Sequence, residues 1–146
     1  MDKDIYYIKA FKEASKKKPN LEASFSLLEK SCEAGNPEAA YALWTWYMHG
    51  KYVKKNIARA TRLLKQAAKQ NVPSALYDLA VSYEKGNGVK KDLKRAMEYY
   101  LRASLYGDRD AIFEVGRCYY YGIGTEKDRR IAKIWLERAK AIGIDR

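Results

Sequence analysis

The amino-acid sequence predicts an all-α protein, an α-solenoid of about four stacked helix-turn-helix repeats of 36 residues. Three observations predict this fold. The same residue types recur at a constant spacing, polar residues suited to helix starts occupy aligned positions, and glycines suited to helix ends do the same. A single helix pair of this kind buries only one of its faces, so the pairs are expected to stack on one another.

The repeat needs no gaps when the chain is stepped by 36 residues from Ala39. The aligned sets are Ala39, Ala75 and Ala111; Leu43, Leu79 and Val115; Tyr47, Tyr83 and Tyr119; Gly50, Gly86 and Gly122; Ala60, Ala96 and Ala132; and Ala67, Ala103 and Ala139. Stepping backwards gives a weaker first copy, as expected of an N-terminal cap. The expected organisation is one domain over residues 1–146, with a degenerate unit at 3–38 and units at 39–74, 75–110 and 111–146.

Each unit is expected to begin with a helix that starts near a proline. Pro37 and Pro73 suit the first helical turn, where the missing N–H costs nothing. Asn36 and Asp108 precede two of these starts as N-caps. The aligned glycines Gly50, Gly86 and Gly122 are expected to end these first helices in the left-handed conformation.

The second helix of each unit is expected to follow an aligned Asn or Asp N-cap, at Asn20, Asn56, Asp92 and Asp128. It is expected to end at Gly35, Asn71, Gly107 and Gly143. In the repeat at 39–74, an inward stripe of small and large apolar residues lets neighbouring helices interlock, namely Ala60, Leu63, Leu64 and Ala67. Tyr52 aligns with Gly88 and Gly124, which predicts a different inter-helix turn in that unit.

These aligned residues resemble the Sel-like repeat family, a slightly longer relative of the tetratricopeptide repeat. The best copy runs from Ala75 to Ala96, and the last copy repeats it with Val115-Gly116, Tyr119, Gly122-Ile123-Gly124, Asp128, Ala132 and Trp135. The resemblance covers essentially the whole chain. It implies a helical solenoid whose first helices line a concave surface, and a protein that binds another protein.

No catalytic, metal or cofactor site is predicted. Cys32 and Cys118 lie far apart and His49 is the one histidine, which is too few ligands for zinc. His49 is better explained as a groove or surface contact than as a general base. The glycines of Gly86-Asn87-Gly88 follow a predicted helix and belong to the repeat, so they do not form a phosphate loop. The expectation is a protein that is not an enzyme and needs no cofactor.

The chain shows no apolar segment of membrane-spanning length and no secretory signal, which predicts a cytoplasmic location.

A protein or peptide partner is expected in the concave groove lined by the first helices. Aromatic rings with mixed polar groups recur there, as at many binding surfaces. The expected groove residues are Tyr41, Thr45, Met48, His49, Tyr77, Val81, Glu84, Phe113, Arg117, Tyr120 and Tyr121. The alternative is that some of these rings belong to the core between repeats. Tyr77 is the expected central anchor, and its truncation is expected to leave the fold intact.

The basic residues form a second candidate surface. The net charge is +11, and Lys54, Lys55, Lys90, Lys91 and Lys127 fall in the predicted turns between first and second helices. Stacked turns would align them into one basic ridge. The ridge either keeps the protein soluble or docks an acidic partner. Aromatic residues do not appear interleaved with it in the sequence, so base stacking is not favoured.

Three classes of function follow in order of preference. The first is a protein–protein interaction module, and a sharper version of it is an immunity-like or antitoxin-like protein that neutralises an acidic partner. The second is non-specific nucleic-acid binding through the basic ridge, and the third, an enzyme, is the least favoured. The last helix carries Ile131, Ile134, Trp135 and Ile142 with no following unit, which predicts pairing with a partner or with a second copy as a homodimer.

Overall fold

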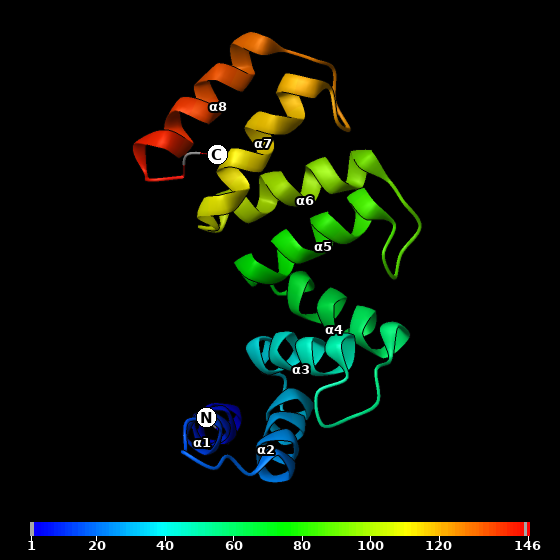
Figure 1. Ribbon diagram of the computed structural model, residues 1–146, viewed down its shortest axis with the longest axis vertical. Coiled ribbons are helices and arrows are strands. Elements are labelled where there is room, and N and C mark those ends of the chain that lie inside the picture. Colours follow the sequence, from blue (N-terminus) through cyan, green and yellow to red (C-terminus); the bar gives the residue numbers. More distant parts are fainter. Residues whose placement is uncertain (1, 145) are drawn as a thin grey trace. The chain divides into compact units, whose positions relative to one another are not determined.

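A computed structural model describes residues 2–144 and 146, and within them it contains eight α-helices of 13 residues each and no strand (Figure 1). The helices are α1 (Asp2–Ala14), α2 (Leu21–Glu33), α3 (Pro37–His49), α4 (Ile57–Lys69), α5 (Pro73–Lys85), α6 (Leu93–Leu105), α7 (Arg109–Tyr121) and α8 (Arg129–Ala141). They form two compact units: the first unit, residues 1–70, contains α1 to α4, and the second unit, residues 71–146, contains α5 to α8. The predicted all-helical fold is confirmed.

The helix starts are the ones predicted from the sequence. The side chains of Asn20, Asn56, Asp92 and Asp128 each accept a hydrogen bond from a backbone N–H in the first turn of the second helices. Such a cap satisfies a donor that the helix leaves without a partner. Asn36 caps α3 and Asp108 caps α7 in the same way.

The helix ends also agree with the prediction. Gly50, Gly86 and Gly122 follow α3, α5 and α7 with φ of 67°, 71° and 74°, in the left-handed region. An added Cβ on Gly86 would lie only 3.2 Å from the Lys91 Cβ, so the turn packs closely on this glycine. The second helices are followed by Gly35, Asn71, Gly107 and Gly143, all at positive φ.

The prediction of a different turn at Tyr52 is wrong. Tyr52 adopts a φ of 62°, in the same region as its aligned partners Gly88 at 77° and Gly124 at 69°. The Asn56 N–H donates to the Tyr47 carbonyl at 2.9 Å, as the aligned residues do in the other two turns. The strain of a left-handed tyrosine is offset by packing, because its ring lies 5.6 Å from Phe25 and 6.2 Å from Trp46.

In the first unit, α3 packs on α2 of the α1–α2 pair. Phe25 of α2 lies under α3, with ring centroids 5.6 Å from Trp46 and 6.0 Å from Tyr47. Buried alanines and leucines of α3 and α4 complete the core of this unit, among them Ala39, Leu43, Ala60, Leu63 and Leu64. Small residues beside large ones let the helices interlock, as predicted.

In the second unit, α7 packs on α6 of the α5–α6 pair in the same way. The turn after α7 approaches the start of α6 so closely that a Cβ on Gly124 would overlap the Leu93 carbonyl oxygen and lie 3.0 Å from the Met97 Cβ. Gly116 fulfils a similar need between α7 and α8, because a Cβ there would lie 2.7 Å from a Leu136 methyl carbon. The buried side chains of this unit include Leu76, Leu79, Tyr100 and Val115.

Candidate protein-binding cleft

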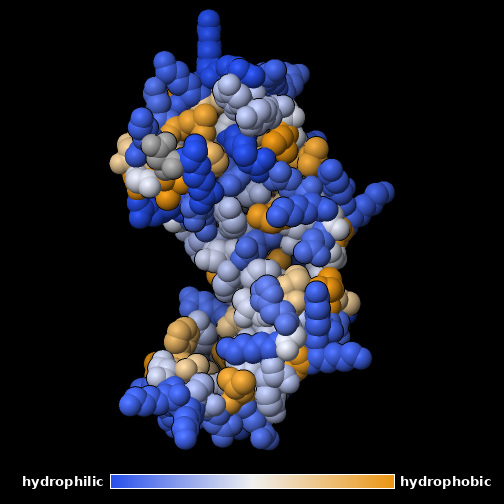
Figure 2. Space-filling view, in the orientation of Figure 1, coloured by the Kyte–Doolittle hydropathy of each residue, from blue (hydrophilic) through white to orange (hydrophobic). Residues whose placement is uncertain are grey.

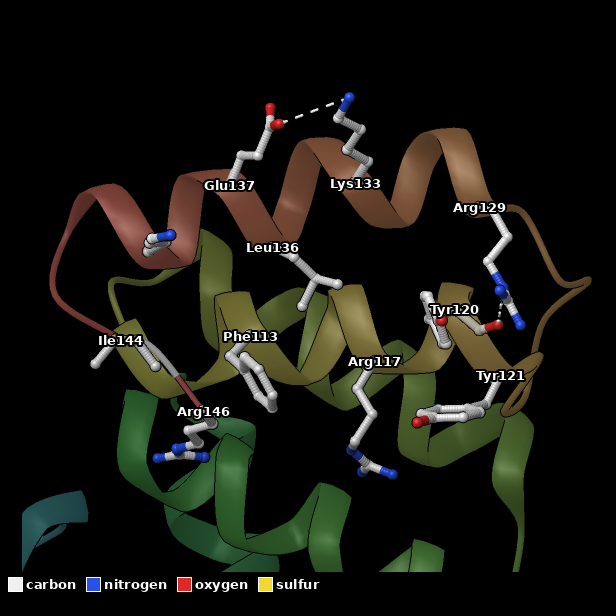
Figure 3. A pocket seen from close by; sticks show the side chains of 11 residues that line it. Phe113, Arg117, Tyr120, Tyr121, Arg129, Lys133, Leu136, Glu137, Ile144 and Arg146 are labelled. Carbon is white, nitrogen blue, oxygen red and sulfur yellow. Dashed lines mark hydrogen bonds and ion pairs between the residues drawn. The ribbon is translucent and has the colours of Figure 1, made fainter.

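An open cleft of about 720 Å³ lies on the α7–α8 pair of the second unit (Figure 3). Its lining residues come from both helices and from the segment that follows α8: Phe113, Arg117, Tyr120, Tyr121, Arg129, Lys133, Leu136, Glu137, Lys140, Ile144 and Arg146. Figure 2 shows hydrophobic side chains surrounded by hydrophilic ones on the visible face of this pair. The cleft has the size and the mixed lining of a binding site.

The floor of the cleft is apolar and largely aromatic. Leu136 projects from α8 toward α7, and Phe113 lies beside it on α7 (Figure 3). Tyr120 and Tyr121 form one end, with ring centroids 4.8 Å apart in an edge-to-face arrangement. Tyr121 is 65% exposed, so its ring is available to a partner. Rings of this kind offer large contact area at a small loss of rotamer freedom.

The α8 rim of the cleft, defined as Arg129, Lys133 and Lys140, is cationic. The Arg129 guanidinium lies 3.7 Å from the centroid of the Tyr120 ring and donates a hydrogen bond to the Tyr120 carbonyl at 3.0 Å. Lys133 is 75% exposed, and its ion pair with Glu137, at 3.9 Å, is weak. The rim therefore presents more positive than negative charge to the solvent.

A network of ion pairs underlies the α7 side of the cleft. The Arg117 guanidinium donates to Glu84 at 2.6 Å and to Glu114 at 2.6 Å, which joins α5 to α7. Tyr100 donates to Glu84 at 2.9 Å, and Tyr77 donates to Glu114 at 3.4 Å. Two carboxylates thus neutralise Arg117, which leaves its charge largely unavailable to a partner.

The electrostatics of this network follow from burial and hydrogen bonding. Burial acts to raise the pKa of Glu84, but the hydrogen bonds from Arg117 and Tyr100 outweigh it and the pKa is lowered. Burial, the hydrogen bond to Glu84 and the charge of Glu84 all raise the pKa of Tyr100. Glu84 is therefore held as an anion and Tyr100 as a neutral donor.

The repeat family is established by comparison with known proteins. The Sel1 repeat family model matches residues 11–36, 37–72, 73–108 and 109–143. The chain belongs to the Sel1 repeat family. Sel1 repeats are helical scaffolds that generally mediate protein–protein interactions. Each match after the first begins where a first helix begins, at Pro37, Pro73 and Arg109.

Solved structures agree with this assignment. A Sel1 repeat protein from Oxalobacter formigenes is 36% identical with a TM-score of 0.75, over 80% of this chain and 87% of that one. A protective antigen of uropathogenic Escherichia coli with an SLR fold is 26% identical with a TM-score of 0.90, over 97% of this chain and 31% of that one. An immunity protein from Pseudomonas aeruginosa is 22% identical with a TM-score of 0.65, over 98% of this chain and 53% of that one, and shows the fold alone. No curated protein matches the chain.

The structure places four of the predicted groove residues at the cleft. Phe113, Arg117, Tyr120 and Tyr121 line the cleft, while Tyr77, Val81 and Glu84 lie on α5, which the network joins to α7. Tyr77 packs edge-to-face on Tyr100 at 5.7 Å as well as bonding to Glu114. Tyr77 is thus a packing residue of this unit, so its truncation does not test the groove cleanly.

The remaining predicted groove residues lie on α3 in the first unit. Tyr41 stacks on Trp44 at 5.3 Å, and the Thr45 hydroxyl donates to the Ala42 carbonyl at 2.7 Å. Met48 is half-buried and His49 is exposed at the helix end. A groove shared by the first helices of both units stays a prediction.

Several residues that line the cleft were not predicted from the sequence, namely Leu136, Glu137, Lys140, Ile144 and Arg146. Arg129 and Lys133 were not predicted to line it either. A signal for Arg129, Lys133 and Lys140 exists in the repeat, because α8 carries these cations at positions where the earlier second helices carry uncharged residues.

All five lysines of the predicted basic ridge are exposed: Lys54, Lys55, Lys90, Lys91 and Lys127. They lie in the turns between first and second helices, as predicted. Within the second unit the turn after α7 packs on the start of α6, which is where the α5–α6 turn ends.

Outside the five lysines of the basic ridge, two arginines of α6 lie beside aromatic rings. The Arg95 guanidinium lies 5.7 Å from the Tyr83 ring, Tyr83 stacks on Tyr99 at 5.6 Å, and Arg102 lies 5.3 Å from the Tyr99 ring. Tyr83 lies on α5, whereas Arg95, Tyr99 and Arg102 lie on α6. The contacts of Tyr83 therefore join two helices and cannot be recognised as a local sequence pattern. Tyr83 is buried, so its ring is already used within the protein.

Within residues 2–144 and 146, no cluster of three or more His, Cys, Asp or Glu side chains is arranged to hold a metal ion. Cys118 is buried, and burial raises the pKa of its thiol to about 12, whereas Cys32 is half-buried. None of the described helices has the length and apolar character to cross a bilayer. The cytoplasmic location stays a prediction.

Proposed function

We propose that this protein is an interaction module that holds a segment of another protein in the α7–α8 cleft. The observation that carries the proposal is the combination of an apolar aromatic floor with an exposed cationic rim in one cleft. Hot spots of protein interfaces are enriched in tyrosine and arginine and lie in such pockets. The family supports binding without catalysis, since its repeats are protein-interaction scaffolds.

A narrower form of the proposal is an immunity-like protein that neutralises an acidic partner. The α8 rim favours an acidic partner, because opposite charge speeds association and excludes partners of like charge. The rival surfaces are the basic ridge, which would bind nucleic acid with a steep salt dependence, and pairing of two copies through α8. The cleft is preferred over the ridge because it adds apolar floor residues to its charge.

The proposal is tested by selecting ligands from a displayed library of random peptides against the intact protein. We expect selected peptides to lose about 1–2 kcal/mol of binding free energy on Tyr121→Ala, as for a hot-spot ring. Tyr106→Ala is the matched control, since Tyr106 directly follows α6 in the same unit, much as Tyr121 ends α7, and is 52% exposed. Affinities are measured by calorimetry.

Equal losses for Tyr121→Ala and Tyr106→Ala, or none for either, would remove the cleft from the proposal. Peptides whose affinity falls only on Lys90→Glu with Lys91→Glu would point to the basic ridge. A dimer mass by ultracentrifugation that Ile134→Glu converts to a monomer would instead favour pairing of two copies through α8.

A further inference from the structure

Within each of the two units, a helix pair binds the first helix of the next pair, and this packing shows what kind of element such a face accepts. In the first unit, α3 packs on α2 by placing Trp46 and Tyr47 on Phe25. In the second unit, α7 packs on α6, and the turn that follows α7 covers Leu93 and Met97. In both cases one helix of 13 residues occupies the face.

The cleft is the same face of the next helix pair. A step of 36 residues carries Leu93 to Arg129, Met97 to Lys133 and Tyr100 to Leu136. Arg129, Lys133 and Leu136 all line the cleft. The α7–α8 pair therefore presents an open helix-docking face in the position that a first helix covers elsewhere in each unit.

The face of α8 is more positively charged than the aligned face of the other second helices. At three aligned positions, the first three second helices carry an uncharged residue and α8 carries a cation. The aligned sets are Leu21, Ile57, Leu93 and Arg129; Phe25, Thr61, Met97 and Lys133; and Cys32, Ala68, Ser104 and Lys140. A helix that docks here meets apolar side chains on the floor and positive charge along α8.

We propose that the cleft docks one helix of a partner protein, and that this helix is acidic along the side that faces α8. The inference rests on the proposed function and names its partner class. Buried cations without opposite charge are costly, so an apolar or basic helix would be rejected at the α8 rim. A second copy of this chain is a poor occupant, because each copy carries a net charge of +11.

The probe is a synthetic peptide with the sequence of α7, Arg109–Tyr121, carrying Cys118→Glu and Tyr119→Glu. These two positions align with Trp46 and Tyr47, which contact Phe25, and Phe25 aligns with Lys133. The new carboxylates are thus directed at the α8 rim. One comparison peptide carries Lys at both positions, and another adds Gly116→Pro, which breaks a helix at its centre.

We expect the Glu peptide to bind the intact protein at least roughly tenfold more tightly than the Lys peptide, by fluorescence anisotropy at low salt. The proline peptide should bind at least roughly tenfold more weakly than the Glu peptide, because it cannot form the helix. The peptide should gain helical circular dichroism on binding, since short helices are marginal when free.

Two variants of the protein test whether the α8 rim determines the preference for the Glu peptide over the Lys peptide. Lys133→Glu with Lys140→Glu should reverse the preference in favour of the Lys peptide. The matched control is Lys65→Glu with Lys69→Glu, which changes the same charge at two exposed positions on α4 and should keep the preference for the Glu peptide. Circular dichroism and thermal melting confirm that both variants fold.

The inference would be overturned if the Glu and Lys peptides bound equally well, or if the proline peptide bound as tightly as the Glu peptide. It would also be overturned if no peptide bound. No binding at all would mean that the cations only solvate this end of the helix stack. If library peptides depend on Tyr121 yet lack acids or contain central prolines, the proposed function holds and the acidic helix is wrong. If library peptides ignore Tyr121, the proposed function itself fails.

Discussion

The Arg117 guanidinium bonds to two carboxylates at once, and this arrangement decides what the residue can do. Glu84 comes from α5 and Glu114 from α7, so the three charges join two first helices of the second unit. Glu114 is buried, and its side chain also accepts bonds from Tyr77 and Arg146. Removing Arg117 would take from the half-buried Glu84 its ion pair, which is costly. Arg117 serves stability more than recognition.

The lowered pKa of Glu84 makes this network sensitive to acid. A carboxyl whose folded pKa lies below its unfolded value of about 4.3 adds stability above that value, and the gain is lost as pH falls through the folded pKa. At neutral pH, Glu84→Gln should lower the free energy of unfolding by about 1–2 kcal/mol, since it weakens hydrogen bonds to a charged group.

Urea unfolding at several pH values measures this effect. The gap between wild type and Glu84→Gln should close as pH falls below about 4. Glu98→Gln on the exposed face of α6 is the control and should show little change at neutral pH. A gap that is constant from neutral to acid pH would contradict the proposed charge of Glu84.

At the scale of the single element, the α3–α4 turn sets two effects against each other. A left-handed tyrosine costs on the order of 1–3 kcal/mol. Each aromatic pair contributes about 0.5–1.5 kcal/mol beyond the apolar area that it buries, and the Tyr52 ring makes two such pairs, with Phe25 and with Trp46. Because the half-exposed ring also buries apolar area, we expect the contacts to outweigh the strain.

We therefore expect Tyr52→Gly to destabilise the protein by about 1 kcal/mol, although glycine is the residue that the other turns use. Tyr52→Phe keeps the ring and should leave stability nearly unchanged. Chemical denaturation of both variants gives the comparison. A Tyr52→Gly variant more stable than wild type would show that backbone strain dominates at this turn.

The same turn marks the limit of prediction from sequence. Helix starts and ends could be predicted because caps and glycines act within a few residues of the chain, as at Asn56 and Gly50. Tyr52 could not, because its contacts with Phe25 come from a residue far away in sequence. The cleft could be predicted only in part, for the same reason. Tyr121 follows the repeating pattern of the first helices and was predicted as a binding residue. Leu136 and Lys140 line the cleft only because α8 folds onto α7, which no local pattern indicates.

At the scale of the whole molecule, the net charge of +11 adds a long-range attraction for an acidic partner. Long-range charge acts mainly on the rate of association, whereas contacts in the cleft act mainly on the rate of dissociation. The exposed lysines of the basic ridge and the ring of Tyr121 can therefore be separated by kinetics.

With the Glu peptide as the probe, Lys90→Glu with Lys91→Glu should slow association several-fold at low salt and leave dissociation nearly unchanged. The effect should fade as salt shortens the range of the charges to about 8 Å at physiological ionic strength. Tyr121→Ala should instead speed dissociation, because it removes a floor contact with little change in charge. Stopped-flow measurements at two salt concentrations supply both rates. If the lysine variant abolishes binding at all salt concentrations while Tyr121→Ala binds normally, the basic ridge is the working surface and the cleft is not.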